Sequence, residues 1–261
     1  MAMQTEAQTA RIIRDVQSST ARISLHNPPL NVIDFAMMDE LAQALSDIEA
    51  CPGVSMIVIR GEGKSFSAGV DVAAHTPDKV EAMLSKFHGV IRALVSTRKV
   101  TIAAVNGHCL GGGAELAMVC DLVYTTDDAQ WGFPEIKLGC YPPVAATALA
   151  AVVGQKHAAD LILTGRTISG SEAANIGLSN RSVPPDQLNH LVEEALTQLA
   201  NLSPEALAIT KKAIYAWDSI HFDKGLARSE KIYLDELMKT QDTQEGIAAF
   251  LEKREPQWRR K

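Results

Sequence analysis

The sequence predicts an α/β fold followed by a helical C-terminal region. Two nearly continuous apolar runs, VSMIVIR (54–60) and VTIAAV (100–105), have the pattern of strands that are covered on both faces. A glycine-rich segment follows each run, GEGKSFSAGVD after the first and NGHCLGGGAE after the second. From residue 186 onward every periodic segment indicates a helix. We therefore expect an α/β core over residues 1–195 and a helical region over residues 196–261.

The elements follow in order from turn and cap signals. Two β-type runs, Arg11–Val16 and Thr20–Leu25, open the chain, and Asp34 is predicted to N-cap a helix over Phe35–Ala50. Beyond the first buried strand we expect further strands at Asp121–Thr125, Ala129–Gly132 and Arg181–Val183. We expect helices over about Lys79–Val95, over Pro142–Val153 and over Lys156–Thr164. Two more helices are predicted in the C-terminal region, one that Ser203-Pro204 begins and a last one capped by Asp242.

Composition narrows the class of partner. The net charge of −6 and the absence of a long basic run argue against nucleic acid as the main partner. The four cysteines lack C-x-x-C spacing, which fits reduced thiols in a cytoplasmic protein better than a disulfide framework or a zinc site. The first residues have no signal-peptide core, and Glu115 and three glycines interrupt the most apolar stretch, Val100–Val119. We expect no membrane partner and no bound metal.

The glycine-rich segments leave two interpretations open. Glycine after a strand lets the backbone approach a ligand and frees N–H groups to point at it. A helix that begins near Gly112 or Gly113 would present N–H groups without intrahelical partners at the positive end of its dipole. The segments therefore indicate either an oxyanion or phosphate site, or tight turns alone. Neither has the spacing of a P-loop or of a dinucleotide fingerprint.

Two glutamates are candidates for proton transfer. Glu115 lies in the first turn of an otherwise apolar helix, and Glu135 follows the aromatic segment QWGFP. Carboxyl groups in apolar surroundings tend to have raised pKa values, so one of the two could act as an acid and the other as a base. The alternatives are structural. The negative charge of Glu115 would interact favourably with the positive end of its helix dipole, and Glu135 would be a surface residue after a proline turn.

Nine segments, read together, point to a family. They are SFSAGVD (65–71), NG (106–107), GGGAELA (111–117), CD (120–121), GFPE (132–135), LTG (163–165), ISGSEA (168–173), GL (177–178) and FLEKR (250–254). In this order, and along nearly the whole chain, they resemble the enoyl-CoA hydratase (crotonase) superfamily. The resemblance implies a spiral of ββα units, C-terminal helices that mediate trimerisation, and a homotrimer or a hexamer made of two trimers.

The resemblance also implies a site for an acyl-CoA, with coenzyme A as part of the substrate and no other cofactor. The N–H groups of Val70 and Gly112 would form an oxyanion hole for the thioester carbonyl. Glu115 would be the base toward water and Glu135 the acid that protonates the thioester-side carbon. The coenzyme A and substrate contacts would come from Ala68, Asp71, Val72 and Lys253, and the substrate pocket would contain Trp131, Pro143 and Val144.

One departure bears on the substrate. Where many hydratases carry a glycine-rich turn, this chain has GCYPPVAA (139–146), and Pro143 has no N–H to offer a bound water. The run PEIKLGCYPPVAA is similar to that of dienoyl-CoA hydratases that act on cyclohexa-1,5-diene-1-carbonyl-CoA in aromatic degradation. We therefore expect a lyase that adds water to a conjugated enoyl or dienoyl thioester. The alternatives are an enoyl-CoA isomerase and a non-catalytic, RNA-associated relative.

Overall fold

The structure is a computed structural model that describes residues 10–215 and 218–259. Its strands are β1 (Ile12–Gln17), β2 (Thr20–Leu25), β3 (Met56–Gly61), β4 (Val100–Val105), β5 (His108–Leu110), β6 (Leu122–Thr126), β7 (Gln130–Gly132), β8 (Thr167–Ser169) and β9 (Arg181–Val183). The main sheet has the order β1-β2-β3-β4-β6-β9, and a smaller sheet has the order β5-β7-β8. Only the β1–β2 pair of the main sheet is antiparallel.

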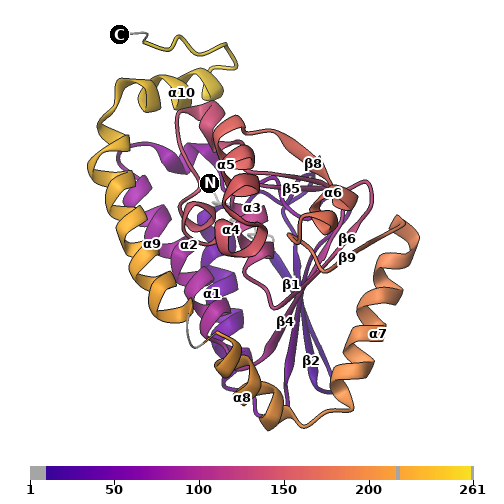
Figure 1. Ribbon diagram of the computed structural model, residues 1–261. Coiled ribbons are helices and arrows are strands. Elements are labelled where there is room, and N and C mark those ends of the chain that lie inside the picture. Colours follow the sequence, from indigo (N-terminus) through magenta and orange to yellow (C-terminus); the bar gives the residue numbers. More distant parts are fainter. Residues whose placement is uncertain (1–9, 216–217, 260–261) are drawn as a thin grey trace, which may run out of the picture.

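The helices surround the main sheet (Figure 1). They are α1 (Phe35–Glu49), α2 (Val80–Ser96), α3 (Gly112–Met118), α4 (Pro143–Val153), α5 (Gln155–Thr164), α6 (Gly170–Asn175), α7 (Leu188–Ala200), α8 (Pro204–Ile214), α9 (Asp218–Asp235) and α10 (Gln241–Leu251), with 3-10 turns η1 (Val72–His75), η2 (Pro134–Leu138), η3 (Pro185–Gln187) and η4 (Leu237–Lys239). Among the described residues, none of these helices combines the length and apolar character of a membrane span.

Strand alternation explains why the two apolar runs are buried on both faces. In β3, Ile57 and Ile59 join the large core cluster with α1 and α2. Met56 and Val58 lie in a second cluster with Leu191 and other residues of α7. Because successive side chains of a strand point to opposite faces, both faces of β3 need an apolar cover. Figure 1 shows α1 and α2 on one side of the sheet and α7 on the other.

The predicted α/β core and helical C-terminal region are confirmed, with local corrections. Within the described residues no strand follows β9. The strands β5 and β8 and the helix α6 were not predicted. The predicted cap of the last helix was wrong: α10 is capped by Thr240, whose side chain accepts from the Thr243 N–H, and Asp242 lies inside the first turn. The division predicted at residue 195 falls within α7 and stays a prediction.

The C-terminal helices pack back over the core. The helix α9 contacts α2 and α4, and α10 contacts η1 and η2. Figure 1 shows α9 and α10 running along the side of the molecule that carries α1 and α2. Elements from the start, middle and end of the chain therefore meet on this side, where they enclose the cavity described next.

Candidate active site

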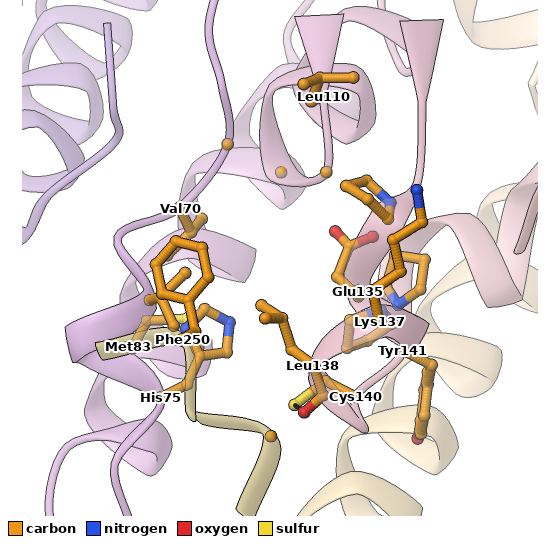
Figure 2. Close-up of a pocket in the computed structure, with 18 of the residues that line it drawn as sticks. Val70, His75, Met83, Leu110, Glu135, Lys137, Leu138, Cys140, Tyr141 and Phe250 are labelled. Atoms are coloured by element: carbon orange, nitrogen blue, oxygen red, sulfur yellow. Dashed lines mark hydrogen bonds between the residues drawn. The ribbon is translucent and has the colours of Figure 1, made fainter. Parts of the chain in front are cut away.

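A cavity of ≈ 470 Å³ lies between the two glycine-rich segments, α2, η2 and the C-terminal helices. Its wall contains seven of the residues predicted from the sequence, namely Ala68, Val70, Val72, Gly112, Glu115, Glu135 and Pro143. Figure 2 shows Glu135 facing Val70 across the pocket, with Met83 and Phe250 on the Val70 side and Lys137 beside Glu135. The fold thus brings both candidate carboxyl groups and both candidate backbone donors to one cavity.

The backbone amides of Val70 and Gly112 lie next to each other. A Cβ atom on Gly112 would stand 3.3 Å from the Val70 nitrogen and 2.6 Å from Val70 Cγ2, so only glycine fits there. Gly112 is the first residue of α3, and the preceding Gly111 has φ 51. Neither amide is engaged by a backbone carbonyl of the described residues. Two N–H groups at a helix start are an arrangement that suits an oxygen with developing negative charge.

Glu115 is held by the beginning of a second helix. Its side chain is buried, with the residue 2% exposed, and Oε1 accepts N–H groups of Val144 at 2.8 Å and Ala145 at 2.9 Å. These donors belong to the first turn of α4, where N–H groups have no intrahelical partner. The structural alternative, in which Glu115 serves only the dipole of its own helix, does not account for this contact with α4.

The carboxyl group of Glu135 has fewer hydrogen-bond donors around it than that of Glu115. It lies in η2, and its Oε2 is buried without a hydrogen-bond partner among the described residues. A Cβ atom on Gly111 would stand 2.6 Å from Glu135 Oε1, so the glycine-rich turn before α3 makes room for this carboxyl group. An unpartnered buried carboxyl oxygen is costly when charged, which favours the protonated form.

The two carboxyl groups titrate as a pair. Burial raises the pKa of Glu115, while the N–H of Ala145, the charge of His88 and the N–H of Val144 act in the opposite direction. Burial raises the pKa of Glu135 well above its ordinary value, and the charge of Glu115 raises it further. A proton shared by the pair is therefore favoured on Glu135, and the negative charge is favoured on Glu115.

Four predicted site residues lie outside the cavity wall. Trp131 is fully buried in the core, where its Nε1–H donates to Thr125 Oγ1 at 3.0 Å, because β7 alternation turns it inward. The side chain of Val144 also joins the core, and only its N–H serves the site. Neither side chain lines this cavity, and their predicted place in the substrate pocket stays a prediction.

The other two residues are polar and lie near the pocket margins. The carboxylate of Asp71 accepts the N–H of Ala73 at 3.0 Å and caps η1, so it is engaged in the backbone of the wall. Lys253 is exposed just after α10, while the next residue, Arg254, does line the cavity. A role for Lys253 toward coenzyme A stays a prediction.

Residues that the sequence reasoning missed complete the wall. Several of them come from α2 and from the C-terminal half, including His88, Cys140, Tyr141, Tyr233, Phe250 and Arg254. Burial raises the pKa of Cys140 to about 11, so this thiol is neutral and a poor nucleophile. His88 stands on the apolar face of α2 with Leu84, Phe87 and Ile91, and a histidine within such an apolar stripe was the signal available in the sequence.

Comparison with known proteins agrees with this geometry. A family model for enoyl-CoA hydratase/isomerase matches residues 15–261. The chain is 36% identical over 245 residues to a cyclohexa-1,5-dienecarbonyl-CoA hydratase of Thauera aromatica, which covers 92% of this chain and 93% of the relative. It is 36% identical over 239 residues to a probable enoyl-CoA hydratase of Mycobacterium bovis, with 90% and 93% covered.

Solved structures give the same answer. An enoyl-CoA hydratase/isomerase of Xanthobacter autotrophicus Py2 superposes with a TM-score of 0.85 at 30% identity, covering 93% of each chain. An enoyl-CoA hydratase of Mycobacterium avium subsp. paratuberculosis superposes with a TM-score of 0.87 at 25% identity, covering 96% of this chain and 99% of the other. The chain belongs to the enoyl-CoA hydratase/isomerase family, and the crotonase-like fold and hydratase-type enzyme class predicted from the sequence are confirmed.

Proposed function

We propose that the protein adds water to a conjugated enoyl- or dienoyl-CoA thioester, with Glu115 as base and Glu135 as acid. The observation that carries the proposal is the pair of carboxyl groups in one cavity with two unengaged backbone amides. The unequal supports of the two carboxyl groups favour one ionised and one protonated partner, which is the starting state that hydration requires.

The proposed reaction balances within this site. Glu115 takes one proton from water while the water oxygen bonds to the electron-poor alkene carbon. The alkene electrons move toward the thioester carbonyl, whose oxygen becomes an enolate and accepts the N–H groups of Val70 and Gly112. The enolate then takes the proton of Glu135 at carbon. One water has been added, and transfer of the proton from Glu115 back to Glu135 restores the starting state.

For the substrate we propose cyclohexa-1,5-diene-1-carbonyl-CoA, to which water adds across the conjugated system. Support comes from the similarity to the hydratase of Thauera aromatica and from the GCYPPVAA segment, in which Pro143 lines the cavity. Linear enoyl-CoAs would be poorer substrates, because Pro143 replaces a residue whose N–H could hold water.

A parallel assay in ¹⁸O-labelled water tests both parts of the proposal. We expect ¹⁸O incorporation with both substrates, and a higher kcat/KM for cyclohexa-1,5-diene-1-carbonyl-CoA than for crotonyl-CoA. Equal or faster reaction of crotonyl-CoA would overturn the substrate assignment. Turnover that moves the double bond without incorporating ¹⁸O would identify an isomerase, and salt-sensitive RNA binding with no turnover would favour the non-catalytic alternative.

We also propose that the chain assembles as a homotrimer or a dimer of trimers, as the family resemblance implies. A second, larger cavity of ≈ 760 Å³ between α4 and α9 supports the proposal, since its lining includes Val119, Ala148, Val152 and Ile232. Light scattering should give three or six times the chain mass of 28.1 kDa. A monomer at micromolar concentration would contradict this assembly.

A further inference from the structure

His88 presents a buried nitrogen for which the described part of the chain supplies no partner. The residue is fully buried and lines the same cavity as Glu115 and Glu135. Its Nε2 makes no hydrogen bond to any residue that the structure describes. Leaving a buried polar atom without a partner destabilises the fold, so one retained in the wall of a ligand cavity points to a partner that arrives with the ligand.

The other ring nitrogen is firmly held. His88 Nδ1 lies 2.7 Å from Glu230 Oε1 on α9, and Arg92 Nη2 donates to the same oxygen at 2.9 Å. These two contacts lower the pKa of Glu230, with the His88 contact as the larger cause, so the carboxylate is ionised and can only accept. Nδ1 is therefore the donor in this pair, so the tautomer that the contact selects for the neutral ring has its lone pair on Nε2.

The water of the proposed reaction needs an acceptor in addition to Glu115. A water molecule has two protons, and Glu115 takes one of them. The first turn of α4 has no donor left to orient this water: Pro143 lacks an N–H, Val144 and Ala145 donate to Glu115, and Ala146 donates to the Pro142 carbonyl. Glu135, which holds the shared proton, acts as a donor. The unpartnered Nε2 of His88 lies in the wall of the same cavity as Glu115 and can serve as this acceptor.

We propose that His88 is a water-positioning residue: its Nε2 accepts the second proton of the attacking water and, together with Glu115, aims the water oxygen at the alkene carbon. Glu230 and Arg92 fix the tautomer that makes this possible. This inference rests on the proposed hydration, and it assigns to α2 and α9 a role in the chemistry of the site.

Two reactions of the same site separate water positioning from support of the cavity. Hydration needs the attacking water, whereas exchange of the α-proton of a saturated acyl-CoA in D₂O does not. In the exchange, Glu135 first passes its proton to Glu115 or to solvent, then removes the α-proton as a carboxylate while the amides of Val70 and Gly112 hold the enolate oxygen, and finally returns a deuteron to carbon after exchange with D₂O. We expect His88→Leu to lower the kcat of hydration roughly tenfold to hundredfold, the order of loss expected for a misplaced reactant. The α-proton exchange rate should stay within about twofold of wild type, since no step of it uses the attacking water.

A conservative variant and a matched control complete the test. Gln can place an amide oxygen near the position of Nε2, so His88→Gln should recover part of the hydration that His88→Leu loses. His190→Gln removes a histidine that also pairs with a glutamate, His190 Nδ1 lying 3.4 Å from Glu194 Oε1, but on the exposed surface of α7. This control should leave both reactions unchanged.

Equal loss of hydration and exchange in His88→Leu, with no recovery in His88→Gln, would assign His88 a purely structural role. Wild-type hydration in His88→Leu would also overturn the inference. Failure of the proposed function is a separate result, because wild-type protein would then hydrate neither crotonyl-CoA nor the cyclic dienoyl-CoA. That result would overturn the inference together with the function on which it rests.

Discussion

Glu115 enters the cavity from α3 and Glu135 enters it from η2, and the two regions differ in what they offer a carboxyl group. Two N–H groups of α4 donate to Glu115 Oε1, whereas Glu135 Oε2 is buried without a partner among the described residues. The first environment stabilises a negative charge and the second disfavours one. The comparison teaches that identical side chains can acquire opposite roles from the backbone that surrounds them.

The largest loss of activity is expected when the proposed oxyanion hole for the thioester oxygen is disturbed. In Gly112→Ala the added Cβ would stand 2.6 Å from Val70 Cγ2 and 3.3 Å from the Val70 nitrogen, so Val70 must shift and the added methyl group crowds its amide. Losing one oxyanion donor typically costs about 10²–10³ in kcat, and we expect a loss of this order. Gly89→Ala in α2 is the control, since a Cβ there meets nothing within 4 Å. Equal kcat values for the two variants would contradict the proposed oxyanion hole.

A second variant acts on the carboxyl group of Glu135 from the turn before α3. Gly111→Ala would place a Cβ 2.6 Å from Glu135 Oε1 at φ +51, so the carboxyl group must move. A misplacement of this kind can cost about 10²-fold, which is the loss of kcat that we expect. Gly63 also has a positive φ, +77, with no atom within 4 Å of an added Cβ. Gly63→Ala therefore carries the backbone strain without the clash, and a similar loss of activity in it would disprove the steric explanation.

The difference in protonation predicts a difference in the pH dependence of stability. A carboxyl group with a raised pKa in the folded state contributes stability that is full below its ordinary value of 4.5 and is lost as pH rises through the folded pKa. Glu135→Gln removes this loss. The free energy of unfolding of Glu135→Gln relative to wild type should therefore increase as pH rises above 4.5.

Urea titrations at several pH values measure this difference for Glu135→Gln, and the same titrations on Glu115→Gln sharpen the comparison. The pKa of Glu115 is raised against the opposing effect of two N–H donors, so its relative gain in stability with pH should be smaller than that of Glu135→Gln. Equal slopes for the two variants would mean that the supports do not distinguish the two carboxyl groups.

The smallest effect on activity is expected at Trp131. Trp131→Phe removes the buried hydrogen bond to Thr125 Oγ1, which should lower the free energy of unfolding by about 1–3 kcal/mol. Because Trp131 does not line the cavity, kcat and KM should stay close to wild type. A large change of KM with unchanged stability would return Trp131 to the substrate pocket.

The sequence carries much of the fold because its signals are local. The runs VSMIVIR and VTIAAV predict β3 and β4. The glycine-rich segment that follows each run predicts a turn at the site. The strands β5 and β8 were not predicted because each is a three-residue segment bordered by turn-forming residues, in NGHCLGGG and GRTISG, whose composition indicates turns. Trp131 stands four residues before Glu135, yet the turn at Phe133-Pro134 sends the two side chains to different places.

Long-range contacts explain what the sequence does not reveal about the site. His88 and Glu230 are 142 residues apart, and no spacing rule joins a residue of α2 to one of α9. The contact of Glu115 with the start of α4 spans 29 residues and uses backbone N–H groups, which leave no trace in side-chain identity. The family resemblance identified the carboxyl groups, but their unequal supports become visible only after folding.

The most direct test of the account compares Glu115→Gln with Glu135→Gln in two reactions, hydration of the cyclic dienoyl-CoA and α-proton exchange of a saturated acyl-CoA in D₂O. Both variants should lose hydration by roughly 10²–10⁴-fold, the usual contribution of general acid–base catalysis. Exchange should persist in Glu115→Gln and disappear in Glu135→Gln, while the exposed Glu194→Gln matches wild type in both reactions. Exchange that persists in Glu135→Gln and disappears in Glu115→Gln would reverse the proposed roles and contradict the account.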